Sequence, residues 1–320
     1  MLISRRDLLK TAGSATVLAS ASPGLVFAAA PTNKRFVTII LRGGMDALTA
    51  VAPYADPNYT RLRSFLSLGK PGEKNGALDL NGHFGLDPNL SYLEPLYKKG
   101  ELAILHAATT NYRGRSHFDG QNVLENGTPK PYGTDSGWLN RSLELMTDGE
   151  RRVGLSVGHA VPLMMRGKTD VQTWAPSALP KAEGDFLDRL MRVYEGDPVF
   201  EHALKQAMKS AALSAGVTDG MGKVNARSTS LKIMAEAAGK LLAKTNGPRI
   251  AVIESGGWDT HAGQHLLLRN KLKELNIGLE VDESTLSNST QVTQRVAVPT
   301  TLSFTVALTY TSSRAPPIIC

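Results

Sequence analysis

Short apolar runs, each followed by glycines and then by polar side chains, dominate the hydrophobic pattern of this 320-residue chain. Residues 36–41 and 250–253 are rich in β-branched side chains and nearly continuous in apolar character. That pattern is typical of strands buried in the middle of a parallel sheet. Residues 102–108 form a third such run, and residues 90–99 before it have helical spacing. A helix between two strands is a βαβ unit, so the pattern predicts an α/β fold with a parallel sheet.

The second half of the chain has a helical pattern. Residues 168–245 repeat apolar positions at helical spacing, which predicts a mostly helical insertion that covers one side of the sheet. Residues 265–280 predict an amphipathic helix by the same criterion. From residue 281 to 320 there is no glycine and no lysine, and 14 of 40 residues are Ser or Thr. This change of composition predicts that residues 281–320 form an aberrant, disordered tail.

The first thirty residues predict a targeting signal rather than a part of the fold. Residues 4–10 contain a twin-arginine pattern, residues 11–27 are weakly apolar, and residues 28–30 are a small-residue cleavage site. These features are typical of a twin-arginine signal peptide and predict a periplasmic or secreted protein. The alternative is that the segment is the basic start of a core helix. Cys320 is the one cysteine, so an intrachain disulfide is excluded.

Composition and charge exclude two classes of protein. Hydrophobic residues make up 42% of the chain and charged residues 20%, which is typical of one large globular domain or two small ones. The formal net charge is +7, but there is no basic block with interleaved aromatics, so nucleic acid is not an expected partner. No apolar run after the N-terminal segment is long enough to span a bilayer.

Two of the predicted strands end in the same way, with a glycine pair and then an acid. Asp46 follows residues 36–41, and Asp259 and His261 follow residues 250–253. Ligand sites in open α/β sheets lie beyond the carboxyl ends of strands, and oxygen and imidazole ligands suit divalent metals. We therefore predict that Asp46, Asp259 and His261 are ligands of Zn, Mg, Mn or Ca. The alternatives are that both aspartates cap helices and that His261 is a surface residue.

A polar stretch near the middle of the chain carries the candidate catalytic residues. Ser116 followed by Asp119 fits a capping box, so a helix is predicted to begin here and to run to about Glu125. A hydroxyl at a helix N-terminus, beside Arg113 and Arg115, suits an oxyanion such as phosphate or sulfate. Ser116 would be a nucleophile if a metal lowered its pKa. The capping role needs no chemistry, and the two roles are compatible.

Two further features carry less weight. Residues 154–158 match the Gly-x-Ser-x-Gly nucleophile pattern, but Pro162 and Gly167 follow too soon for the long helix that this pattern requires. His106 lies at the end of a predicted strand, where it either faces the site or is a packed, hydrogen-bonded histidine.

Four motifs in order resemble a known family. They are the twin-arginine start at residues 4–10, the strand end at 41–46, and the segments 116–121 and 257–261. Together they resemble the exported, sulfatase-like family called domain of unknown function fifteen-oh-one, which belongs to the alkaline phosphatase superfamily. The resemblance covers about residues 4–280.

The resemblance implies a fold and an activity. The fold would be a doubly wound, mostly parallel sheet of the alkaline phosphatase type over residues 31–280, with the helical insertion inside it. Members of the superfamily bind one or two divalent metals and cleave phosphate or sulfate esters through a Ser, Thr or modified Cys. By this resemblance Asp46 would hold one metal, Asp259 and His261 would hold the other, and Ser116 would attack.

The chain departs from the family after residue 280. Family members continue with a Thr-Glu-Phe-Gly-Arg motif and an Asp-His-Gly segment, which supply further ligands, and neither is present here. We therefore expect an exported metal-dependent hydrolase of phosphate or sulfate esters, inactive if the missing ligands are essential. The alternative is a non-catalytic exported binding or assembly protein on the same fold. The expected partners are a small-molecule or polysaccharide ester and the twin-arginine translocation machinery.

Overall fold

The fold is that of a computed structural model of the whole chain. The predicted signal peptide over residues 1–30 and Cys320 lie outside the residues that the structure describes. The described residues are 35–106, 108–146, 154–176, 184–218, 230–244, 247–287, 293–299 and 303–311.

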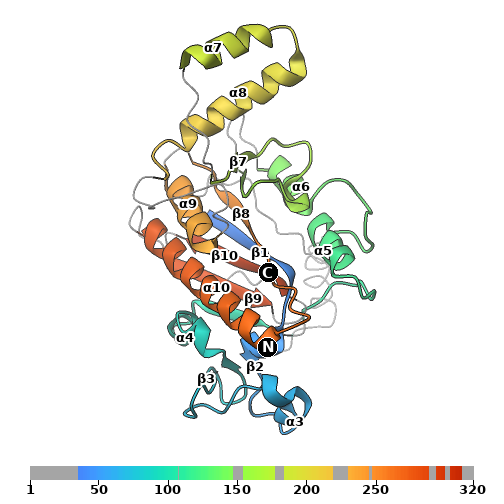
Figure 1. Cartoon of the computed structure of the whole chain (residues 1–320), viewed down its shortest axis with the longest axis vertical. Helices are drawn as coiled ribbons and strands as arrows, with labels where there is room; N and C mark the ends of the chain where they lie inside the picture. Colours follow the sequence, from blue (N-terminus) through green and yellow to red (C-terminus); the bar gives the residue numbers. More distant parts are fainter. Residues whose placement is uncertain are drawn as a thin grey trace, which may run out of the picture.

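The centre of the molecule is one seven-stranded sheet (Figure 1). Its strands are Arg35–Met45 (β1), Leu102–Leu105 (β5), Gly154–Val157 (β6), Gln172–Trp174 (β7), Ile250–Ser255 (β8), Thr293–Pro299 (β9) and Ser303–Thr311 (β10). They lie in the order β5-β9-β10-β1-β8-β6-β7. Strand β10 is antiparallel to both of its neighbours, and every other pair is parallel. The sheet is mainly parallel, so the prediction of an α/β fold is confirmed.

Helices cover both faces of this sheet, an arrangement compatible with a doubly wound fold (Figure 1). One face carries Leu231–Ala243 (α9) and Gln264–Ser287 (α10), together with the shorter Leu93–Lys98 (α4). The other face carries Trp138–Glu144 (α6) and the 3₁₀ helix Leu163–Met165 (η3). The helix predicted at residues 265–280 is confirmed as α10, and the helix predicted at 90–99 is confirmed as α4.

The alternation of side chains along β1 explains how both faces are buried. Val37, Ile39 and Leu41 pack in the larger core with α9 and α10, whereas Phe36 and Ile40 pack in the smaller core with α6 and η3. Successive residues of a strand point to opposite faces, so a strand covered on both sides must be apolar at nearly every position. This requirement is why β1 has an almost continuous apolar sequence.

The remaining elements lie around the sheet. A second sheet of three short strands lies near α4, at the lower end of the view in Figure 1, and an arm of two helices projects at the upper end. The small sheet consists of Val51–Ala52 (β2), Leu78–Asp79 (β3) and Gly85–Leu86 (β4), and the arm consists of Gly184–Val193 (α7) and Pro198–Leu213 (α8). The other helices are Ala47–Ala50 (α2), Tyr59–Arg63 (α3), Ser64–Leu66 (η1), Pro88–Leu90 (η2) and His117–Asn126 (α5).

The segment 168–245 is only in part the helical insertion that its pattern predicts. It contains α7, α8 and α9, but it also contains β7, which extends the sheet beside β6. Helix α9 belongs to the main core, because Leu231, Ala235 and Leu242 are completely buried there. Only α7 and α8 project from the body (Figure 1). A three-residue strand such as β7 is too short to leave a period in the sequence.

The structure also differs from the expectation of a disordered tail after residue 280. Helix α10 continues to Ser287, and β9 and β10 form an antiparallel hairpin that lies between β5 and β1. Residues 303–311 alternate between apolar and polar or small side chains, with Phe304, Val306, Leu308 and Tyr310 at every second position. That period of two is typical of a strand. The lack of glycine and lysine therefore did not indicate a lack of structure.

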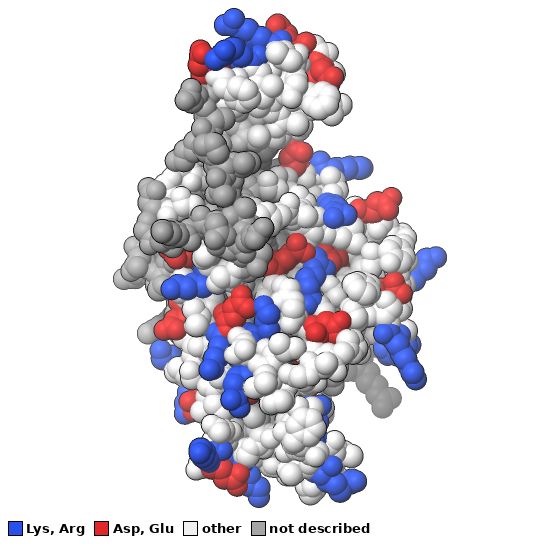
Figure 2. All heavy atoms as spheres, viewed as in Figure 1, with Lys and Arg blue, Asp and Glu red and all other residues white. Residues whose placement is uncertain are grey.

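On the face drawn in Figure 2, basic and acidic side chains are intermixed, and neither sign forms a continuous stripe. None of the helices in the described segments is both long enough and apolar enough to cross a membrane.

Candidate metal centre

The two glycine–acid turns lie against each other. Strands β1 and β8 are parallel neighbours, so their carboxyl ends reach the same edge of the sheet. Gly43 has a φ of +108°, and a Cβ added to it would lie 2.4 Å from the backbone nitrogen of Asp259. The backbone N–H of Trp258 also donates to the carbonyl oxygen of Arg42 at 3.1 Å. The first turn therefore requires glycine because the second turn packs directly on it.

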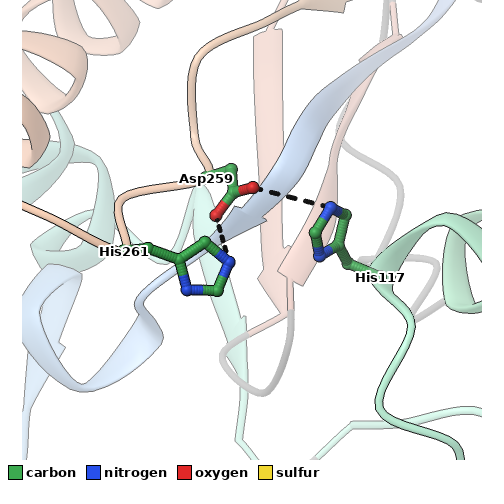
Figure 3. Close-up of side chains that lie close together, drawn as sticks. All are labelled: His117, Asp259 and His261. Carbon is green, nitrogen blue, oxygen red and sulfur yellow. Dashed lines mark ion pairs between the residues drawn. The ribbon is translucent and has the colours of Figure 1, made fainter.

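A cluster of three potential metal ligands lies beside these turns (Figure 3). Asp259 and His261 come from the loop between β8 and α10, and His117 comes from the first residue of α5. Nε2 of His261 lies 2.8 Å from one carboxylate oxygen of Asp259, and Nε2 of His117 lies 3.5 Å from the other. One ligand atom from each residue falls within 4.8 Å of the other two.

The cluster is open to solvent on one side. The side chain of His261 is 83% exposed and that of Asp259 is 40% exposed, whereas that of His117 is 27% exposed. Two imidazoles and one carboxylate are the donor set of several catalytic metal sites, in which the remaining positions hold water or substrate. The residues present therefore fit a divalent metal with free coordination positions.

Asp46 is not part of this cluster, although sequence analysis predicted it as a ligand. One carboxylate oxygen accepts the backbone N–H of Leu48 at 3.1 Å, so Asp46 is the N-cap of α2. The other oxygen accepts hydrogen bonds from the Thr49 hydroxyl, at 3.0 Å, and from the side-chain amide of Gln264, and it forms an ion pair with Arg63. Asp46 therefore has the role that sequence analysis gave as the alternative, a helix N-cap, and both of its carboxylate oxygens are bonded to groups of the protein.

Ser116 has the capping role that its sequence position predicts. Its side-chain oxygen accepts the backbone N–H of Asp119 at 3.2 Å, and α5 begins at the next residue. The helix ends at Asn126, where Gly127 adopts a left-handed conformation with a φ of +69°. The helix predicted from Ser116 is therefore confirmed. Because Ser116 directly precedes His117, the backbone brings its hydroxyl to the same end of α5 as the metal cluster.

The two arginines before Ser116 are exposed. The guanidinium of Arg113 donates to the backbone carbonyls of Thr110 at 2.9 Å and Tyr112 at 3.3 Å. Arg113 therefore binds its own loop rather than the cluster. Arg115 is exposed on the same loop.

Sequence analysis missed His117. The residue lies inside the segment 116–121 that was singled out for its resemblance, but attention fell on the hydroxyl of Ser116. The available signal was the position itself, because His117 directly follows Ser116, the predicted N-cap and candidate nucleophile, and so lies in the first turn of the same helix.

A partly buried ionic network joins the elements that carry the three ligands. Arg42 on β1 donates to Glu254 on β8 at 2.7 Å and to Gln121 on α5 at 3.0 Å, and it pairs with Glu125 on α5. Burial by itself lowers the pKa of Arg42, but the hydrogen bonds and charges of Glu125 and Glu254 outweigh it, and the net pKa is raised. Arg42 thus remains charged and holds α5 against the ends of both strands.

Two other candidates from the sequence are not part of the site. Ser156 is buried within β6, donates to the carbonyl of Ala160 at 3.3 Å and is not followed by a long helix, which agrees with setting aside a serine nucleophile there. His106 stacks on Phe84 with ring centroids 4.0 Å apart. Desolvation and the neighbouring His83 lower the pKa of His106.

Fold and site together define an α/β protein with a candidate metal cluster at the carboxyl edge of its sheet. Beyond that class, the comparisons identify no relative: no family model, no curated protein and no solved structure matches the chain.

Proposed function

We propose that this protein is an exported, metal-dependent hydrolase of phosphate or sulfate esters, of the alkaline phosphatase type. The observation that carries the proposal is the convergence of His117, Asp259 and His261, which come from two distant segments and leave an open side. A divalent metal bound there would polarise an ester oxygen. Two imidazoles in the donor set favour zinc or another transition metal over magnesium and calcium, which prefer oxygen ligands.

The chain itself supplies the groups that would bind and attack the ester. Ser116 is the candidate nucleophile, since its hydroxyl lies at the N-terminus of α5, directly before His117. The N-terminus of α5 favours a negatively charged group, and the exposed guanidinium of Arg115 adds positive charge to the same loop.

The metal centre is tested first by binding to the full chain. We expect one zinc ion per chain by calorimetry, and at least a ~100-fold weaker affinity for His117→Ala or Asp259→Ala, because each change removes a ligand. His202→Ala is the matched control, since His202 also lies 3.5 Å from an aspartate, Asp170, at an exposed position outside the cluster. Unchanged zinc affinity in the two ligand variants would refute the proposed centre.

The reaction is tested with 4-nitrophenyl phosphate and 4-nitrophenyl sulfate on the zinc-loaded protein. At saturating zinc, Ser116→Ala should lower kcat by about 1,000-fold or more if Ser116 is the nucleophile. A protein that binds zinc but hydrolyses neither ester supports the second candidate, a non-catalytic exported binding protein. That candidate is favoured by the capping role of Asp46, which leaves the described centre with three ligands.

Export through the twin-arginine route is a separate part of the proposal, and it rests on residues 4–10. Replacing both Arg5 and Arg6 with lysine should leave the protein inside the cytoplasm, as measured by cell fractionation. Export at the normal level in that variant would contradict the twin-arginine assignment and would leave the metal centre unaffected.

A further inference from the structure

A cluster of two tyrosines and one aspartate lies next to the metal cluster. Tyr112 and Tyr132 each donate a hydroxyl hydrogen bond to Asp119, at 3.1 Å, and each uses a different carboxylate oxygen. Asp119 lies in the first turn of α5, two residues after His117, and its backbone N–H is bound to Ser116. Both oxygens and the backbone of Asp119 are therefore held by residues outside the helix.

Tyr132 reaches this position at a conformational cost. Its φ is +56°, in the left-handed region that bulky residues rarely adopt, and the residue is 72% exposed to solvent. Its backbone N–H donates to the side-chain oxygen of Asn122 on α5 at 2.7 Å. The loop after α5 thus bends back onto the helix that it follows, and no burial of the ring compensates for the strain. Strain of this kind persists where the surrounding contacts fix the residue, and it is concentrated at functional sites.

The His117 ring has few direct restraints of its own. It lies 3.5 Å from Asp259, which is a long contact, and its centroid lies 4.3 Å from that of the exposed Phe118. The direction of the imidazole therefore depends on the backbone of the first turn of α5. That turn is fixed by the Ser116 cap on one side and by the tyrosine hydroxyls on the other.

We infer that Tyr132 and Tyr112, acting through Asp119, are positioning residues that hold His117 in place for the metal. This inference rests on the proposed metal centre. Residues that hydrogen-bond a metal ligand directly change metal affinity by about 10- to 100-fold when they are removed, and the tyrosines, which act through Asp119, should lie at the lower end of that range. The hydrogen bond to Asp119 raises the pKa of Tyr132, and desolvation together with its own bond to Asp119 raises that of Tyr112, so both hydroxyls remain donors at neutral pH.

The test separates positioning from a simple contribution to stability. Tyr132→Phe keeps the ring and the backbone strain but removes the hydroxyl, and we expect zinc to bind the full chain about 10-fold more weakly. Tyr132→Gly relieves the strain and also removes the hydroxyl. It should weaken zinc binding at least as much, while the melting temperature of the zinc-free protein stays the same or rises. A residue with only a structural role would move affinity and melting temperature together.

Tyr54→Phe is the matched control. The hydroxyl of Tyr54 also donates to an aspartate, Asp79 on β3, at 2.6 Å, but this pair lies away from α5. Its removal should leave the zinc dissociation constant unchanged. Tyr112→Phe is the second variant and should repeat the effect of Tyr132→Phe.

Each outcome is informative. If the wild type binds zinc and the dissociation constants of Tyr132→Phe and Tyr112→Phe lie within about twofold of the wild-type value, this inference is overturned and the metal centre is not. An equal loss in Tyr54→Phe would also overturn it. Absence of zinc binding by the wild type would instead overturn the metal centre itself, together with this inference.

Discussion

The two turns at the carboxyl edge of the sheet share a sequence pattern but differ in what their acids do. Residues 43–46 and 256–259 both contain two glycines, one further residue and an aspartate. Helix α2 begins directly after Asp46, so its carboxylate caps that helix and is fully engaged. Helix α10 begins only at Gln264, five residues after Asp259, and this carboxylate faces two histidines instead. The distance from the acid to the next helix decides which aspartate is available to a metal.

The largest effect is expected from a substitution at Gly43, where the two turns are in contact. Gly43→Ala would place a Cβ 2.4 Å from the backbone nitrogen of Asp259 at a φ of +108°. We expect a loss of about 3 kcal/mol or more in the free energy of unfolding, measured by urea denaturation, and a loss of zinc binding. Gly256→Ala is the control, because nothing lies within 4 Å of its added Cβ. A Gly43→Ala protein as stable as Gly256→Ala would show that the turns are not in contact.

A smaller effect is expected at Asp46, and it sharpens the contrast between the turns. Asp46→Ala removes the α2 cap and the partner of Arg63, and we expect a loss of about 2 kcal/mol in the free energy of unfolding. Asp46→Asn retains a capping oxygen and should cost about 1 kcal/mol. Zinc affinity should change by less than about threefold in both, since Asp46 lies outside the cluster. A loss of zinc affinity as large as that of Asp259→Ala would make Asp46 a ligand after all.

The sequence predicted the elements of the site better than the use of each residue. The strands β1, β5 and β8 follow from continuous apolar runs, and the meeting of the two turns follows from parallel strands having their ends at one edge. The contacts of the Asp46 carboxylate could not be predicted from the sequence, because Arg63 and Gln264 come close to Asp46 only in the folded chain. His117 was missed because a single histidine in a helix has no periodic signal.

The hairpin of β9 and β10 was missed for a different reason. The alternation of Phe304, Val306, Leu308 and Tyr310 was present, but the unusual composition of the segment was given more weight than its period. Composition reports how a segment differs from the rest of the chain, whereas periodicity reports which structure it can form. The pairing of β10 with β1 is specified by residues more than 250 positions apart, so no local pattern could place the hairpin between β5 and β1.

The position of β10 has a consequence for how the protein is made. Strand β1 is the first strand to leave the ribosome, yet both of its partners, β8 and β10, come from residues beyond 249. Its backbone hydrogen-bonding groups therefore stay unpaired, and its apolar side chains stay uncovered, through most of the synthesis of the chain, and this state is prone to aggregation. Nascent chains that stop before β8 should need a chaperone to stay in solution, and the sheet can close only after translation has passed residue 311.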